Sequence, residues 1–164
     1  MVLVCGPDAM EDRVDASNIS AAIDEAKSAL AARAASFAAE HPSDAATTAA
    51  GWTLNEMLAH VAFWEEAAPP VISYMLRGLP MPGSVEFGSG YVTHGEWPNF
   101  EIHNAREAAW GRSQTLESVL ARWERAHAAL LAVLETVTVE EARTHARYYA
   151  DLAGHLSEHA AELD

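Results

Sequence analysis

The feature that most constrains the fold is a stripe of apolar residues that recurs every three or four positions over residues 116–134. Residues at this spacing lie on one face of an α-helix and can bury that face against other helices. A second stripe of the same period covers residues 19–37. No segment shows the convincing alternation that indicates a strand, so the sequence predicts an all-α fold. The stripe residues are Ile19, Ile23, Ala26, Leu30, Ala34, Phe37, Leu116, Val119, Leu120, Trp123, His127, Leu130, Leu131 and Leu134.

Two helix starts are marked by capping boxes, in which a threonine and a glutamate three residues later satisfy free backbone N–H groups. Thr53-x-x-Glu56 opens the second predicted helix, and Thr138-x-x-Glu141 opens the last one. The last predicted helix presents one inward face to the rest of the protein. The residues of that face are Tyr148, Leu152, His155, Leu156, His159 and Leu163.

Prolines and glycines predict where the helices end. Pro69-Pro70 lacks backbone donors and crowds the preceding turn, so the second helix should end just before Pro69, with a short helical continuation over residues 71–76. Asn99 can cap a further helix, which Gly111 is expected to interrupt.

The chain is expected to form one domain over residues 17–164, preceded by a tail over residues 1–16. Four long helices with one elaborate central connection predict an antiparallel four-helix bundle. The connection, residues 77–99, is rich in glycine and proline. A loop of this length is often functional, for instance as a lid. Its aromatic residues could cover a pocket or pin the loop; they are Phe87, Tyr91 and Trp97.

The charge of the chain excludes several classes of partner. It has 10 Lys and Arg residues against 24 Asp and Glu, a net charge of −14, and Lys27 is its one lysine. Binding to nucleic acid or to an anionic membrane surface needs clustered basic residues, so neither is expected.

No apolar run approaches the ~18 residues of a membrane span. The start has no basic segment of a signal peptide, so we expect a cytoplasmic protein. The single Cys5 excludes an internal disulfide.

Three histidines on apolar helix faces predict a metal site. His155 and His159 lie one helical turn apart, so both rings can reach one point, and His60 lies on the apolar side of the second helix. Neutral imidazole is a common ligand of zinc, nickel, copper and iron. Three protein ligands would leave positions open for water or substrate, which is the pattern of a catalytic metal.

The alternative is that these histidines are buried core residues, as we expect for His127 on its apolar stripe.

His155-Leu-Ser-Glu158-His159 also matches the inverted zinc-protease signature H-x-x-E-H. However, Glu158 should lie about 100° around the helix from His159, facing the rim or solvent, so we discount a protease. Four histidines are expected at the surface, of which His94 and His103 could instead enter a pocket; they are His41, His94, His103 and His145.

The segment Trp52-Thr-Leu-x-Glu56-x-Leu58-Ala-His60-Val-x-x-Trp64-Glu65, with the terminal His155-x-x-x-His159, resembles the DinB-like superfamily. This group includes the N-terminal domain of mycothiol-dependent maleylpyruvate isomerase and related thiol S-transferases. The resemblance spans residues 19–163, and residues 52–104 also resemble the colibactin self-protection branch. The resemblance to the DinB-like superfamily implies a bundle of up-down-down-up connectivity that is often dimeric. It also implies a divalent metal held by His60, His155 and His159.

These observations lead to three hypotheses. In the first, the protein is a metal-dependent S-transferase of a low-molecular-weight thiol such as mycothiol or bacillithiol, with zinc or nickel as the metal. In the second, it binds or sequesters a small molecule as a self-resistance protein of the same fold. In the third, it is a structural bundle with core histidines that acts through dimerisation. A small-molecule substrate and a homodimer are the expected partners.

Overall fold

The structure, a computed structural model, describes residues 16–42, 46–78, 93–94 and 97–164, and it is almost entirely helical there. The helices are α2 (Ala16–Glu40), α3 (Leu54–Leu76), α4 (Phe100–Arg112), α5 (Leu116–Leu134), α6 (Val139–Thr144) and α7 (Ala146–Ala161).

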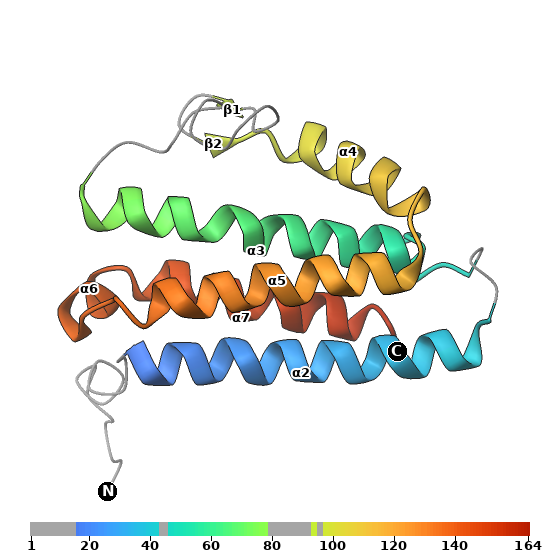
Figure 1. Ribbon diagram of the computed structural model, residues 1–164, viewed down its shortest axis with the longest axis horizontal. Coiled ribbons are helices and arrows are strands. Elements are labelled where there is room, and N and C mark those ends of the chain that lie inside the picture. Colours follow the sequence, from blue (N-terminus) through green and yellow to red (C-terminus); the bar gives the residue numbers. More distant parts are fainter. Residues whose placement is uncertain (1–15, 43–45, 79–92, 95–96) are drawn as a thin grey trace, which may run out of the picture.

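Four of these helices form a bundle with up-down-down-up connectivity (Figure 1). α2 and α7 run in one direction and pack against each other, while α3 and α5 run in the opposite direction and form the second pair. α4 lies along the outer side of α3 and returns the chain, which allows α3 and α5 to be parallel. The all-α prediction and the bundle are confirmed.

The core lies where the apolar stripes of the helices meet. Each fully buried Leu or Ile side chain contributes roughly 1.5–3 kcal/mol relative to its exposed state. The predicted stripes of α2 and α5 are the buried faces of those helices. The largest fully buried apolar side chains are Ile23, Leu30, Met57, Leu58, Ile72, Trp123, Leu130, Leu134, Tyr149 and Leu156.

The predicted end of the second helix is wrong, because α3 continues through Pro69 and Pro70 to Leu76. The two prolines remove two N–H donors from the helix ladder. Packing offsets this loss: Ala68 is 1 % exposed on one side of the prolines and Ile72 is fully buried on the other. Tertiary burial therefore overrides the local preference to stop.

The expected interruption of the helix that follows Asn99 is confirmed one residue after Gly111, since α4 ends at Arg112 and α5 begins at Leu116. A Cβ atom at Gly111 would lie 2.5 Å from the backbone oxygen of Asn55 and 3.0 Å from Cβ of Ala59. The glycine therefore allows the backbones of α4 and α3 to approach each other closely. Asn99 caps α4, as predicted, by accepting a hydrogen bond from the Ile102 N–H.

Both capping boxes are confirmed, at Thr53 and at Thr138. The second box, however, opens the six-residue α6 and not one long last helix. His145, at φ −114° and ψ 22°, separates α6 from α7. This break shifts the buried face, so that Tyr149 is 2 % exposed and the predicted Tyr148 is only partly buried.

The predicted tail, apart from Ala16, and most of the predicted lid lie outside the described residues, including Phe87 and Tyr91. Within the lid segment, the two-residue strands β1 (Thr93–His94) and β2 (Trp97–Pro98) pair in antiparallel fashion. Within the described residues, this short ribbon is accompanied by an isolated antiparallel bridge between Thr47 and Thr53. None of the described helices is both long and apolar enough to cross a membrane.

Candidate metal centre

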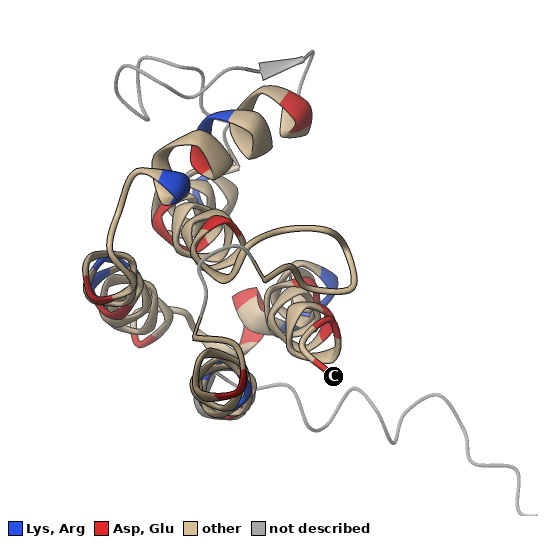
Figure 2. Ribbon diagram, turned by 90° about the vertical axis from the view of Figure 1, so that its right-hand side faces the viewer, with Lys and Arg blue, Asp and Glu red and all other residues tan. Residues whose placement is uncertain are grey.

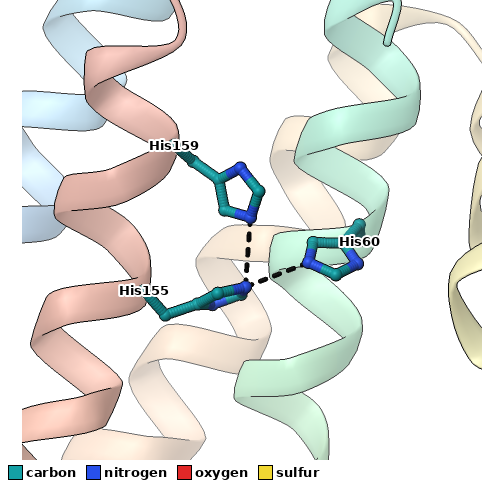
Figure 3. Close-up of side chains that lie close together, drawn as sticks. All are labelled: His60, His155 and His159. Atoms are coloured by element: carbon teal, nitrogen blue, oxygen red, sulfur yellow. Dashed lines mark hydrogen bonds between the residues drawn. The ribbon is translucent and has the colours of Figure 1, made fainter. Parts of the chain in front are cut away.

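The three predicted histidines meet between α3 and α7 (Figure 3). Nε2 of His155 lies 3.0 Å from Nε2 of His60 and 3.1 Å from Nε2 of His159. His60 is buried, and the other two rings are partly buried. The helical spacing of the α7 pair and the packing of the bundle therefore bring three imidazole nitrogens to one point.

The three Nε2 atoms cannot all satisfy one another by hydrogen bonding, and this favours a cation at the cluster. The Nε2 atom of a neutral imidazole carries either one proton or one lone pair. Nε2 of His155 faces two other Nε2 atoms, so at most one of these contacts can be a well-formed hydrogen bond. Three ligands at tetrahedral corners about 2.0–2.1 Å from a zinc ion are separated by about 3.3 Å, close to what the structure shows. The donor set suits a divalent metal ion.

Burial keeps two of these rings neutral. It lowers the pKa of His60 to about 3, helped by the nearby charges that His155 and His159 would carry if protonated. Burial, with the neighbouring His159, also lowers the pKa of His155 to about 4. Both rings therefore have lone pairs available near pH 7, as metal ligation requires.

Two tryptophans flank the His60 ring. The ring centroid of His60 lies 5.2 Å from that of Trp52 and 6.3 Å from that of Trp64. Nε1 of Trp64 lies 3.3 Å from Nδ1 of His60 and 3.4 Å from Oδ1 of Asn104 in α4. Asn104 also hydrogen-bonds to the His60 ring and opposes the lowering of its pKa.

A carboxylate lies behind the third histidine. Nδ1 of His159 is 3.3 Å from Oε2 of Glu162, three residues along the chain. Both atoms are shielded from solvent and neither forms a hydrogen bond within the described residues. The pair is therefore close enough to interact through a small rotation of either side chain.

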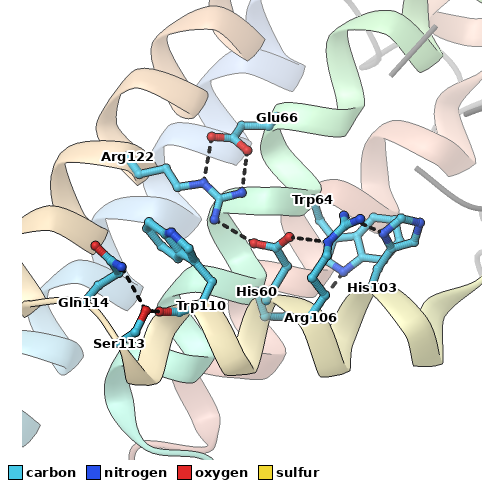
Figure 4. A network of polar contacts seen from close by, with 10 residues as sticks. His60, Trp64, Glu66, His103, Arg106, Trp110, Ser113, Gln114 and Arg122 are labelled. Carbon is cyan, nitrogen blue, oxygen red and sulfur yellow. Dashed lines mark hydrogen bonds and ion pairs between the residues drawn. The ribbon is translucent and has the colours of Figure 1, made fainter. Parts of the chain in front are cut away.

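An ion-pair network holds α4 in place beside the histidines (Figure 4). Arg122 in α5 makes two hydrogen bonds to the carboxylate of Glu66 in α3, at 2.9 and 2.7 Å. It also donates to the buried Glu107 in α4 over 2.6 Å. These bonds tie α3, α4 and α5 together, and so fix the position of Asn104.

The structure corrects the surface placement expected for His103. This residue is fully buried, with its ring stacked on Phe63 at 4.8 Å and its Nδ1 atom 2.9 Å from Arg106. It belongs to the α3–α4 interface and not to the histidine cluster. The signal was in the sequence, since His103 and Glu107 lie one helical turn apart and could share a buried face.

The remaining histidines stay apart from the cluster. His127 is buried, as expected, but it also contacts two carboxylates, with Nδ1 3.2 Å from Glu65 and Nε2 3.2 Å from Asp24. His41 is exposed and His145 is partly buried at the α6–α7 junction. The side chain of His94 lies outside the described residues.

Glu158 is exposed, as predicted. It therefore cannot act as the general base of an inverted zinc-protease site, where the glutamate must face the metal. Sequence reasoning missed the closer carboxylate, Glu162. Its three-residue spacing from His159 was the available signal.

Comparison with known protein families supports this interpretation of the fold. The sequence profile of the DinB superfamily matches residues 22–162, which is most of the chain. The chain belongs to the DinB superfamily. No curated protein and no solved structure gave a match. In this DinB protein, the matched range includes most of α2, the whole of α3, α5 and α7, and all three clustered histidines.

Proposed function

We propose that this DinB protein is a divalent-metal-dependent enzyme that transfers a low-molecular-weight thiol. The observation that carries the proposal is the convergence of three Nε2 atoms from His60, His155 and His159. Zinc or nickel suits three imidazole ligands. We further propose that the thiol is mycothiol or bacillithiol and that the protein acts as a homodimer in the cytoplasm.

The residues around the cluster have distinct tasks in this proposal. His60, His155 and His159 would hold the metal, and a bound divalent ion would lower the pKa of a thiol or water that reaches it. Trp52 and Trp64 shield one side of His60 from water. Because these rings are apolar, they strengthen electrostatic interactions at the site.

The first experiment is elemental analysis of protein purified without a histidine tag. About one divalent ion per chain is expected in the wild type, with loss of the ion in His159→Ala. His41→Ala is the matched control, since His41 is exposed and lies apart from the cluster. Absence of metal in the wild type, even after incubation with zinc, nickel and manganese, would refute the proposal. Thiol-transfer assays with mycothiol and bacillithiol then test the reaction.

A second candidate function is binding of a small molecule without thiol transfer, as in a self-resistance protein. The observation that favours it is an aromatic group beside the cluster: the ring centroid of Phe100, which is 53 % exposed, lies 5.2 Å from that of Trp64. Ligand binding that survives both chelation and His60→Ala would support this alternative. Binding lost on chelation would favour the metal-dependent enzyme.

A further inference from the structure

The Nδ1 atoms of the clustered histidines, which point away from the cluster, need hydrogen-bond partners of their own. Each imidazole has two nitrogens, and a ring that ligates a cation through Nε2 must carry its proton on Nδ1. Metal-binding histidines usually donate this proton to a carboxylate, a carbonyl or a water. The groups that face Nδ1 therefore decide whether the Nε2 lone pair points into the cluster.

Glu162 is placed to accept the proton of His159. Its Oε2 atom lies 3.3 Å from Nδ1, and both atoms are buried without a hydrogen bond. The backbone of Glu162 is fixed as well, because its carbonyl accepts a hydrogen bond from the Ala49 N–H over 3.0 Å. A buried carboxylate oxygen without a donor is costly. A proton on Nδ1 of His159 supplies that donor.

Asn104 is placed to do the same for His60, with Trp64 setting the orientation of the amide. The Trp64 Nε1–H group lies between Nδ1 of His60, at 3.3 Å, and Oδ1 of Asn104, at 3.4 Å. An amide oxygen has two lone pairs, so Oδ1 can accept from both Trp64 and His60. When the Trp64 N–H donates to Oδ1 of Asn104 instead of to Nδ1 of His60, Nδ1 can carry a proton and donate it to the same amide oxygen.

We propose that Glu162 and Asn104 are positioning residues that hold the protons of His159 and His60 on Nδ1 and thereby aim both Nε2 lone pairs at one cation. The negative charge of Glu162 also offsets part of the charge of that cation. This inference rests on the proposed function for the identity of the ligand. The placement of the two protons, however, is a property of the metal-free protein and can be measured without metal.

The first test measures zinc affinity by competition with a chromophoric chelator. Loss of an outer acceptor of this kind costs roughly 10–100-fold in metal affinity, so Glu162→Leu and Asn104→Leu should each weaken zinc binding by that factor. Glu162→Gln and Asn104→Asp keep an acceptor and should recover most of the affinity. Glu158→Leu is the matched control, because Glu158 is an exposed glutamate of α7, four residues before Glu162.

The second test reads the proton positions directly. Long-range ¹H–¹⁵N NMR spectra of the metal-free protein distinguish Nδ1–H from Nε2–H rings. His159 and His60 should be mainly Nδ1–H in the wild type, and Glu162→Leu should shift His159 alone toward Nε2–H. If a leucine variant fails to fold, the variants Glu162→Gln and Asn104→Asp decide the question, since they preserve side-chain size.

The outcomes separate this inference from the proposed function. Unchanged tautomers in both leucine variants, or zinc affinity within twofold of the wild type in both, would overturn the inference. A wild-type protein that binds no metal would overturn the proposed function instead. Tautomers that still depend on Glu162 and Asn104 in that case would leave their positioning role intact.

Discussion

Nε2 of His60 and Nε2 of His155 lie 3.0 Å apart, although 95 positions of sequence separate the two residues. Two neutral imidazoles at this distance can share one proton, yet His155 must also face His159. Without a cation, Nε2 of His155 can therefore form a good hydrogen bond to only one of its two neighbours.

Replacing His155 with leucine should have opposite effects on stability in the absence and in the presence of zinc. In the presence of a chelator, His155→Leu should be at least as stable as the wild type, because it removes a buried polar group with an unmatched contact. Zinc at 100 times its dissociation constant should stabilise the wild type by about 2.7 kcal/mol and the variant not at all. Urea unfolding with and without zinc measures both effects. An equal response of the two proteins to zinc would contradict a site at these histidines.

The buried His127 predicts a dependence of stability on pH. Burial lowers its pKa, but the hydrogen bond and charge of Glu65, together with Asp24, outweigh this and raise the pKa above 6.5, while Lys27 opposes them. A raised pKa in the folded state means that the stabilisation is complete below pH 6.5. It is lost as the pH rises through the folded-state value.

His127→Gln removes this titration and keeps a polar side chain of similar size. The free energy of unfolding of the wild type should exceed that of the variant at about pH 6, and the difference should shrink by about pH 9. Urea titrations at the two pH values measure this difference. A gap that stays constant or widens at high pH would show that His127 is not charged in the folded protein.

Gly111 should tolerate no side chain. Gly111→Ala would place Cβ 2.5 Å from the backbone oxygen of Asn55, which cannot move without shifting α3. The expected loss of stability is about 1–3 kcal/mol, as for overpacking elsewhere. Gly154→Ala is the control in α7, since a Cβ there meets nothing within 4 Å. That change should be neutral or stabilise by about 0.5–1 kcal/mol. Equal effects of the two substitutions in thermal unfolding would argue against the close approach.

Arg122 should be important for holding α4 against α3 and α5. Arg122→Met leaves the buried carboxylate of Glu107 without its closest cation, which should cost about 3 kcal/mol. Arg33→Gln is the control, since it breaks an exposed pair with Asp164 and should cost less than about 1 kcal/mol. Denaturant unfolding compares the two variants. Adding Glu107→Gln to Arg122→Met should recover part of the loss, and no recovery would place the effect elsewhere.

The parts of the fold that depend on local spacing could be predicted from the sequence. The stripes of α2 and α5, the capping boxes at Thr53 and Thr138, and the one-turn spacing of His155 and His159 all depend on a few adjacent turns. The meeting with His60 was predicted only if its helix and the last helix face each other, and in the structure α3 and α7 do so at this point.

The departures came from contacts between distant segments. The helix continues through Pro69 and Pro70 because the residues on both sides of the two prolines are buried. His103 is buried because Phe63 of another helix covers it. Local propensity did not reveal the burial around Pro69. The spacing of His103 and Glu107 indicated a shared buried face, but it did not identify Phe63 as the partner.

The up-down-down-up order places the histidine cluster on a seam. α7 packs mainly on α2, while α3 packs mainly on α5 and α4, and His60 faces His155 where α3 of one group meets α7 of the other. A cation shared across this seam would be a cross-link between two halves of the molecule. The chain has a single cysteine and cannot use a disulfide for that purpose. Removal of the ion would remove this cross-link, as reduction removes a disulfide, and the shared apolar core alone would then hold the two halves together.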